Sequence, residues 1–368
     1  MKNFPPDSLE YYASLLSDIG ALSKLFSESD KPFIHSRTAE YLFCKIFDAE
    51  NLSRSDVAID AKKASVGTGV KTFVYSGRPT YQKIAEFNKA IVQHGGQYGA
   101  EKIQTVSNLR NERIRFVEAT YGIKDLDYHC VLRDNNKIIV YEESMDKIDL
   151  EKIRIDSENA STIRFSDGKN KYSYSISKST ISKEFFPKSI ILETDVKILE
   201  DPFDLLSKLS DDVKVAPKYQ PKPRIVLPMY GYENGLPCVF SRSGLNQWNA
   251  GGRVRSYDEV YLPIPVAVRE KFPNFLPDRE TPFELRLPNN DVLTVKVSQA
   301  EGKALMSNPN SALGEWLLRD VLGLGEGELL TYEHLLGLGI DSVEIFKVDG
   351  EYKANFLPLG SYENFIKD

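Results

Sequence analysis

The spacing of apolar side chains in the first 50 residues predicts two helices. Leucine, isoleucine and tyrosine recur at helical spacing from Leu9 to Leu22. A second amphipathic stretch covers Ser36–Phe47 and places Ala39 and Phe43 on one face. We therefore expect the chain to open with a pair of packed helices.

Alternating polar and apolar positions predict a hairpin after these helices. Residues 56–60 (DVAID) alternate as in a strand, the polar residues 61–65 indicate a turn, and 66–76 indicate a second strand. The segment 81–92 has apolar residues at helical spacing and is expected to form the next helix. Short strands separated by turn residues follow within 125–190, a region to which the pattern assigns no task.

A change of composition divides the chain. Residues 214–228 are rich in proline, lysine and arginine and lack acids, which is typical of an extended linker. Residues 229–368 consist of short strands and one helix at about 312–322, a pattern that favours a small barrel. The expected fold is α+β, with an α/β domain over 1–213 and a mainly β domain over 229–368.

Composition narrows the classes of protein. The chain has 368 residues and a net charge of -6, which argues against non-specific coating of nucleic acid but not against a specific DNA binder. Cys44, Cys130 and Cys238 are far apart, so they indicate neither a zinc ribbon nor a disulfide framework. Free thiols, together with the lack of a signal-like or membrane-spanning apolar run, favour the cytoplasm.

The predicted hairpin carries residues suited to metal-dependent phosphodiester hydrolysis. Such a reaction needs carboxylates that hold Mg²⁺ and a lysine that orients water and offsets phosphate charge. Asp60 ends the first strand, Lys71 lies on the second, and Glu86 follows on the expected helix. Glu40, on the second helix, is a further acid. We predict Asp60 and Glu86 as Mg²⁺ ligands, with Lys71 and Glu40 completing the catalytic group.

Two other interpretations of these residues stay open. Asp60-Ala61-Lys62 matches a D-x-K pattern, so Asp56, Asp60 and Lys62 are a rival set. Aspartate and lysine at strand ends are also common on ordinary protein surfaces. Other nuclease and hydrolase signatures are missing, because no histidine is followed by lysine two residues later and no G-x-S-x-G occurs.

Residues 30–95 resemble the PD-(D/E)XK nuclease superfamily, in the version whose last acid has moved to the next helix. The matching residues are Asp60, Lys71 and Glu86, with Glu40 as the helical acid. The chain departs from the pattern at Gly69, which stands where the strand acid is usual, and no proline precedes Asp60.

Two segments of the second half carry side chains suited to reading DNA. Arginine, asparagine and glutamine form paired hydrogen bonds with base edges. The first segment, 240–256, contains Arg242, Asn246, Gln247, Trp248, Asn249, Arg253 and Arg255. The second contains Lys303, Ser307, Asn308 and Asn310. A core position for Trp248, and a turn with a helix cap at 308–310, are the plainer alternatives.

Residues 235–365, which include these segments, resemble the pseudobarrel DNA-binding domain at the C-terminus of NgoFVII-type restriction enzymes, a fold similar to the plant B-three domain. The resemblance implies a type II restriction endonuclease that binds double-stranded DNA through two arms, the first around Arg242–Arg255 and the second around Lys303–Asn310. A homodimer is expected, since cutting two strands needs two active sites or two visits to the DNA. No membrane partner is expected. The rival function is a non-catalytic DNA-binding regulator.

Overall fold

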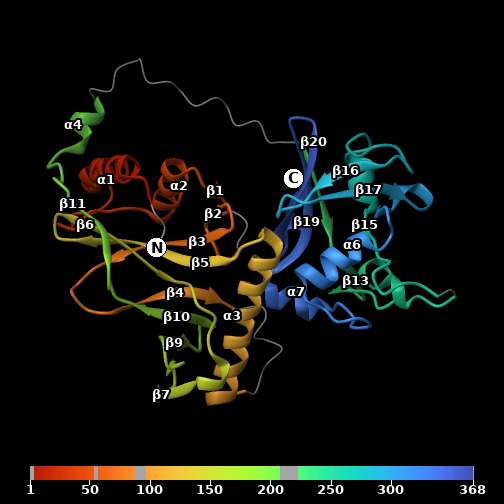
Figure 1. Cartoon of the computed structure of the whole chain (residues 1–368), viewed down its shortest axis with the longest axis horizontal. Coiled ribbons are helices and arrows are strands. Elements are labelled where there is room, and N and C mark those ends of the chain that lie inside the picture. Colours follow the sequence, from red (N-terminus) through yellow and green to blue (C-terminus); the bar gives the residue numbers. More distant parts are fainter. Residues whose placement is uncertain (1–3, 54–56, 88–96, 208–222, 253, 368) are drawn as a thin grey trace. The chain divides into compact units, whose positions relative to one another are not determined.

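The computed structural model describes residues 4–53, 57–87, 97–207, 223–252 and 254–367 (Figure 1). The chain divides into two compact units. Unit 1 comprises Met1–Asn88, His94–Asn111 and Ile123–Tyr219, and unit 2 comprises Lys89–Gln93, Glu112–Gly122 and Gln220–Asp368.

Unit 1 combines helices with two sheets. Its helices are α1 (Pro6–Ala21), η1 (Ser23–Leu25), α2 (Ser36–Phe47), the first part of α3 (Gly99–Tyr121), η3 (Leu150–Lys152) and α4 (Pro202–Ser207). Its strands are β1 (Glu50–Asn51), β2 (Ala61–Lys63), β3 (Val66–Val74), β4 (Thr80–Glu86), β5 (Asp125–Asp134), β6 (Lys137–Ser144), β7 (Arg154–Glu158), β8 (Thr162–Ser166), β9 (Lys171–Ser175), β10 (Thr180–Phe185) and β11 (Ile190–Asp195).

The larger sheet of unit 1 is mixed. Its strand order is β1-β2-β3-β5-β6-β11, and β3 and β5 run parallel whereas the other neighbours are antiparallel. The second sheet, β4-β10-β9-β8-β7, is antiparallel throughout. The parallel pair requires a crossover, and α3 lies within the connection that returns the chain from β3 to β5.

Helices α1 and α2 cover one face of the larger sheet. Tyr12 and Leu16 of α1 pack with Phe43 and Phe47 of α2 over a layer of small and β-branched strand residues. That layer consists of Ala61, Val70, Val131, Ile138 and Val140. Because side chains alternate along a strand, the neighbours of Val70 point to the opposite face of the sheet.

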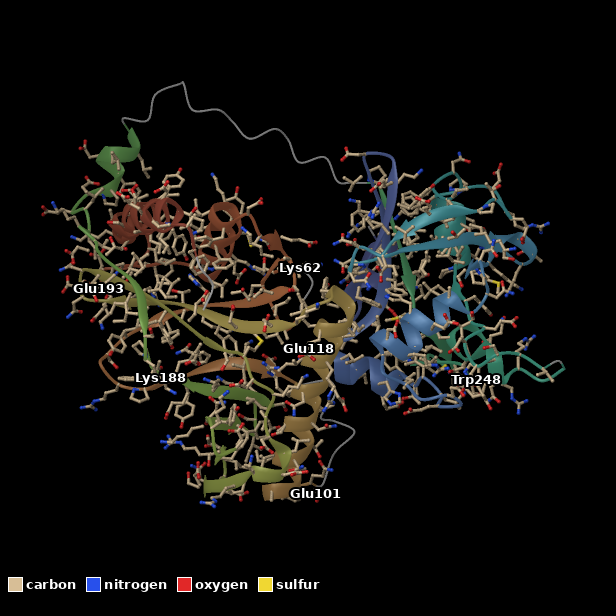
Figure 2. The ribbon with its side chains drawn as sticks, in the orientation of Figure 1. Lys62, Glu101, Glu118, Lys188, Glu193 and Trp248 are labelled. Carbon is tan, nitrogen blue, oxygen red and sulfur yellow. The ribbon has the colours of Figure 1, made fainter. Side chains whose placement is uncertain are left out.

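The sequence predictions for α2 and β3 are confirmed, whereas those between them are wrong. The expected strand at 56–60 is displaced, since the strand is Ala61–Lys63, where a turn was expected. Asp60 immediately precedes it, and residue 56 lies outside the described residues. The polar appearance of 61–65 is misleading because Lys62 is buried, only 7% exposed, within β2 (Figure 2).

The expected helix at 81–92 is also wrong. Residues Thr80–Glu86 form strand β4, and 88–92 lie outside the described residues. Strand β4 pairs along its whole length with β10, from Thr80 opposite Phe185 to Glu86 opposite Thr180. This long-range pairing outweighs the local helical spacing, as tertiary context often does.

Unit 2 is built around one strongly curved sheet. Its strands are β12 (Arg224–Pro228), β13 (Gly231–Glu233), β14 (Leu236–Cys238), β15 (Leu262–Pro263), β16 (Phe283–Arg286), β17 (Val292–Ser298), β18 (Ala304–Ser307), β19 (Ile340–Val348) and β20 (Glu351–Pro358). Its helices are the end of α3, η4 (Gly244–Asn249), α5 (Val266–Lys271), η5 (Ala300–Gly302), α6 (Ala312–Gly314), the π-helix η6 (Glu315–Val321), α7 (Tyr332–Leu338) and α8 (Ser361–Lys367).

The expectation of a barrel in the second half is confirmed. The sheet order is β12-β19-β20-β16-β17-β18-β15, and its two edge strands, β12 and β15, contact each other, so the sheet nearly closes. The expected linker, 214–228, falls mostly outside the described residues, but its last part forms β12 and therefore belongs to the sheet. The expected helix at 312–322 is confirmed as α6 and η6.

Candidate functional site

Asp60, beside strand β2 of the larger sheet, interacts electrostatically with Lys71 and Glu40, and these three residues are called the Asp60 cluster here. Asp60 precedes β2, and its Oδ2 accepts a hydrogen bond of 2.8 Å from the amide of Val70. Lys71 follows Val70 on β3, and Glu40 lies on the neighbouring helix α2. Both side chains act electrostatically on the Asp60 carboxyl group. Lys71 projects from the sheet face opposite the helices and Glu40 lies on the helix side, and the Asp60 carboxyl group is within the electrostatic reach of both.

Helix α2 supplies more than one charge to this cluster. Its N-cap is His35, whose side chain accepts a hydrogen bond from the amide of Arg37. One turn further, Glu40 is buried and its Oε2 lies 3.2 Å from Arg37 Nη1. Arg37 also influences Asp60, so the two acids of the cluster share the field of two cations, Arg37 and Lys71.

The Asp60 carboxyl group holds its proton more tightly than an ordinary aspartate. Burial raises its pKa from the usual 3.8 to about 6, and the Glu40 carboxylate acts in the same direction. Lys71, the hydrogen bond from Val70 and Arg37 oppose this rise. The negative charges of Asp60 and Glu40 are only partly offset by the nearby cations. A further cation would stabilise both ionised carboxylates.

The packing around Gly69 explains why this position lacks the acid that is usual on the strand. A Cβ atom at this position would lie 2.8 Å from Met145 Cε and 3.1 Å from the ring of Tyr128. The same ring lies below Lys71, whose Nζ is 5.9 Å from the ring centroid. The tyrosine therefore occupies the space into which an acid at position 69 would project.

Glu86 lies in a different setting from the other predicted catalytic residues. It ends β4 in the second sheet rather than standing on a helix, and its Oε2 is 3.1 Å from Lys83 Nζ. It is not among the groups that set the pKa of Asp60. Its role as a metal ligand stays a prediction, and unlike Glu40 it lies in the other sheet from Asp60.

One acid on the Lys71 face, Glu143, was not predicted from the sequence. Glu143 of β6 is opposite Tyr128 of β5, which in turn is opposite Gly69 of β3, so their side chains share that face. Glu143 forms an ion pair with the buried Lys183 of β10. Four consecutive residues of β6, 138–141, are buried and two acids follow them, so no alternating pattern in the sequence assigns Glu143 to this face.

Arg110 is a buried cation beside this face. It is 2% exposed, and its Nη2 donates a 3.0 Å hydrogen bond to the hydroxyl of Tyr128. Its Nε and Nη1 are buried and have no hydrogen-bond partner among the described residues. An incompletely paired buried guanidinium is costly to the fold. We infer that Arg110 serves the position of Tyr128 and the potential around Lys71 rather than stability.

Replacing Arg110 by methionine is expected to leave the free energy of unfolding unchanged or to raise it by about 1–3 kcal/mol, because a buried charge is removed at similar volume. Chemical denaturation measures this change. Arg115→Met, at an exposed position of the same helix, is the control and should change it by less than about 0.5 kcal/mol. A loss above about 2 kcal/mol for Arg110→Met would show that the arginine holds the fold together.

No group of three or more histidine, cysteine, aspartate or glutamate side chains within the described ranges is arranged to hold a metal ion. Mg²⁺ commonly binds through only one or two carboxylates and takes its other ligands from water and substrate phosphates. The paired acids Asp60 and Glu40 fit that ligand set.

The segment 240–256 of unit 2 is a long loop around η4. Of its predicted DNA-contacting residues, Arg242 and Asn249 are exposed, while Gln247 and Trp248 are partly buried. Trp248 packs edge-on against Tyr257, with ring centroids 5.0 Å apart (Figure 2). Arg253 lies outside the described residues. Arg242 is therefore available to a ligand, whereas the exposed Asn249 donates a 3.2 Å hydrogen bond from its side-chain amide to the carbonyl group of Ser241.

Two predicted DNA-contacting residues of the loop belong to its internal scaffold. Asn246 is 1% exposed, donates to the carbonyl groups of Phe240 and Leu330, and accepts from the amide of Leu330. Arg255 donates to the carbonyl groups of Gln247 and Ala250 and so closes the loop. The predictions that these two side chains face DNA are not supported, because their hydrogen-bonding groups are engaged within the protein.

The second predicted segment divides in the same way. Ser307 is fully buried and its Oγ accepts a hydrogen bond from the amide of Leu313 at the start of α6, so it caps a helix. Lys303, Asn308 and Asn310 are exposed. The exposed set of both segments is therefore Arg242, Asn249, Lys303, Asn308 and Asn310.

The base of the loop is fixed by the π-helix. Arg319 contacts Asp258 at 2.7 Å and donates to the carbonyl groups of Tyr257, Leu324 and Gly325. Gly314 permits the close approach, because a Cβ atom there would lie 2.2 Å from the carbonyl oxygen of Asp258. The exposed side chains of the 240–256 segment are thus carried on a braced loop.

Asn246→Ala is expected to lower the free energy of unfolding by about 2–4 kcal/mol, because it leaves buried backbone groups of Phe240 and Leu330 without partners. Denaturant unfolding of the full chain measures this loss. Asn364→Ala, at an exposed position of α8 in unit 2, is the control and should change stability by less than about 0.5 kcal/mol. Equal stability of the two variants would refute the scaffold role.

Comparison with known proteins identifies one part of the chain. No helix among the described residues is long and apolar enough to cross a membrane. No curated protein matches the sequence. Residues 227–349 match the family model of the NgoFVII C-terminal B3-like DNA-binding domain. That match runs from the last two residues of β12 to the end of β19, so it leaves out strand β20 of the nearly closed sheet, and it includes both predicted DNA-contacting segments.

Proposed function

We propose that this chain is a type II restriction endonuclease. Unit 2 binds a short sequence in double-stranded DNA, and unit 1 hydrolyses a phosphodiester bond with Mg²⁺. The observation that carries the proposal is the match of residues 227–349 to a restriction-enzyme DNA-binding domain. Within this part of the chain, a loop held in place by Arg319 carries exposed side chains of the types that read bases. The Asp60 cluster supports the catalytic half.

Each residue of the cluster has a role in this proposal. Asp60 and Glu40 hold the metal ion through their carboxylate oxygens. Lys71 orients the attacking water and offsets the charge that develops on the phosphate. Mg²⁺, when bound, supplies a Lewis acid that polarises the phosphoryl group. Two further acids are candidate metal ligands. They are Glu86, which was predicted as the second ligand, and Glu143, which lies on the Lys71 face.

Assembly follows from the need to cut two strands. One cluster hydrolyses one phosphodiester bond at a time, so we propose that the active form is a homodimer that places a cluster at each strand. Light scattering of the protein with its DNA measures the mass of the complex.

The experiment that tests the proposal starts without a known target sequence. Duplexes bound by the purified chain are selected from a random library, and the selected duplex is incubated with the protein in Mg²⁺ or in EDTA. We expect cutting in Mg²⁺ only, and we expect Lys71→Ala to bind the duplex normally but not cut it.

A non-catalytic DNA-binding regulator is the second candidate. It is favoured by the lack of a three-acid group among the described residues and by the position of Glu86 in the other sheet. Tight, salt-sensitive binding to the selected duplex without cutting in any divalent metal identifies this function.

A further inference from the structure

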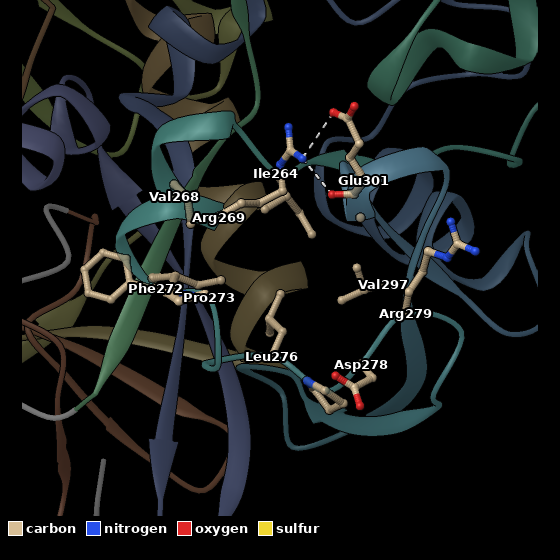
Figure 3. Close-up of a pocket in the computed structure, with 13 residues that line it drawn as sticks. Ile264, Val268, Arg269, Phe272, Pro273, Leu276, Asp278, Arg279, Val297 and Glu301 are labelled. Atoms are coloured by element: carbon tan, nitrogen blue, oxygen red, sulfur yellow. Dashed lines mark hydrogen bonds and ion pairs between the residues drawn. The ribbon is translucent and has the colours of Figure 1, made fainter.

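A pocket in unit 2 has no role in the functions described so far. It lies between helix α5 and the end of the curved sheet and has a volume of about 390 Å³ (Figure 3). Apolar residues that include Ile264, Val268, Leu276 and Val297 line it together with four charged residues, Arg269, Asp278, Arg279 and Glu301. A volume in this range and predominantly apolar walls are characteristic of sites for small organic ligands.

Polar groups stand at the two ends of this pocket. Figure 3 shows Arg269 and Glu301 at one end and Asp278 at the opposite end. Arg269 Nη1 donates to the carbonyl oxygen of Glu301 at 2.6 Å, which fixes the guanidinium. Its Nε is buried and out of reach of a ligand, whereas its Nη2 is accessible and has no hydrogen-bond partner within the described ranges. The pocket therefore offers a donor at one end and an exposed carboxylate acceptor, Asp278, at the other.

The turn that forms one wall is strained. Gln299 has φ 66° and ψ 170°, a region that is otherwise occupied almost only by glycine, and Glu301 has φ 60°. Such conformations persist where a ligand site requires them. The exposed Lys303, predicted to contact DNA, follows this turn directly. The wall of the pocket and the second predicted DNA-contacting segment are thus the same stretch of chain.

We propose that this pocket binds a nucleobase that carries an amino group. A planar ring fits between the apolar walls, a ring nitrogen or carbonyl accepts from Arg269, and the amino group donates to Asp278. Cytosine, adenine and guanine meet this requirement, whereas thymine has no amino group. The base comes either from a nucleotide flipped out of bound DNA or from a free nucleotide. The first source rests on the proposed DNA binding, and the second does not.

The test uses the full-length chain and two arms. In the first arm, 2-aminopurine replaces each base of the selected duplex in turn, and its fluorescence rises severalfold when the base leaves the stack. In the second arm, the four deoxynucleoside monophosphates are titrated and thermal unfolding is followed. Leu276→Trp fills the pocket, Asp278→Asn changes only its exposed acceptor, and Leu236→Trp, on the exposed hairpin of β13 and β14, is the control.

The arms separate the two sources and the two proposals. A fluorescence rise at one position that Leu276→Trp and Asp278→Asn abolish, and Leu236→Trp keeps, supports a flipped base. Stabilisation by dCMP, dAMP or dGMP but not dTMP, lost in Asp278→Asn, supports a free nucleotide. If Leu276→Trp does not fold, Asp278→Asn decides alone. A wild-type chain that binds its duplex but responds in neither arm overturns the pocket proposal, whereas failure to bind any duplex counts against the proposed function.

Discussion

Asp60→Asn is expected to reduce Mg²⁺-dependent cleavage by about a thousandfold or more, because the metal loses a charged ligand in a site that works by electrostatics. The amide keeps the shape of the side chain, and its oxygen can still accept from the amide of Val70. DNA binding, which depends on unit 2, should not change. Single-turnover cleavage of the selected duplex measures the loss.

The same substitution is expected to stabilise the fold in EDTA. The pKa of Asp60 is higher in the folded protein, about 6, than its ordinary value of 3.8, so the folded state binds protons more tightly. The ionised carboxylate therefore destabilises the protein fully above about pH 6, and this cost disappears as the pH falls through about 4. At pH 8 the variant should be more stable by about 1–3 kcal/mol.

Asp125→Asn is the matched control, since Asp125 is an exposed aspartate at the start of β5 in the same sheet. It should change neither cleavage nor stability. If Asp60→Asn cuts DNA as well as the wild type, the cluster is not the catalytic site.

Asn308→Ala combined with Asn310→Ala is expected to weaken binding to the selected duplex by roughly a hundredfold or more. Both side chains are exposed just after β18, and each paired contact of an amide with adenine contributes about 1–3 kcal/mol of discrimination. Binding to unrelated DNA, which depends on phosphate contacts, should be nearly unchanged. Titration of both duplexes at the same salt concentration measures the difference.

The control for this pair is Asn364→Ala, an exposed asparagine on α8. It should bind both duplexes as the wild type does. An equal loss on the two duplexes for the double variant would assign Asn308 and Asn310 to phosphate contacts or to the shape of the turn, and would contradict their role in reading bases.

Local periodicity predicted the elements that pack through one continuous face. Helix α2 has a regular apolar pattern and occurs where expected, and strand β3, rich in valine and threonine, also occurs where expected. Strand β4 was missed because its partner, β10, is remote in the chain. Helix α3 was not predicted, although Ile103, Val106, Ile114 and Val117 recur at helical spacing and are all buried. Its many polar residues concealed that pattern.

Residue types predicted which side chains form hydrogen bonds better than they predicted whether those side chains face solvent or the protein interior. Asn246 and Ser307 have the side chains of DNA readers, but both satisfy backbone groups inside unit 2. An amide or hydroxyl group indicates a hydrogen bond and not its partner. In unit 1, Lys71 and Glu40 both act electrostatically on Asp60, and the catalytic role of the three residues stays a prediction. The prediction for Glu86 depended on a helix where strand β4 forms, and Glu143 becomes apparent only from strand register.

The position of cuts relative to the bound sequence tests the central claim most directly. Plasmid DNA that contains one copy of the selected sequence is incubated with the protein in Mg²⁺, and the ends of the products are sequenced. We expect cuts at one fixed distance from that sequence, and we expect Lys71→Ala to abolish them. Intact plasmid under conditions of full binding, or cuts scattered without relation to the sequence, would refute cleavage by this protein at its bound site.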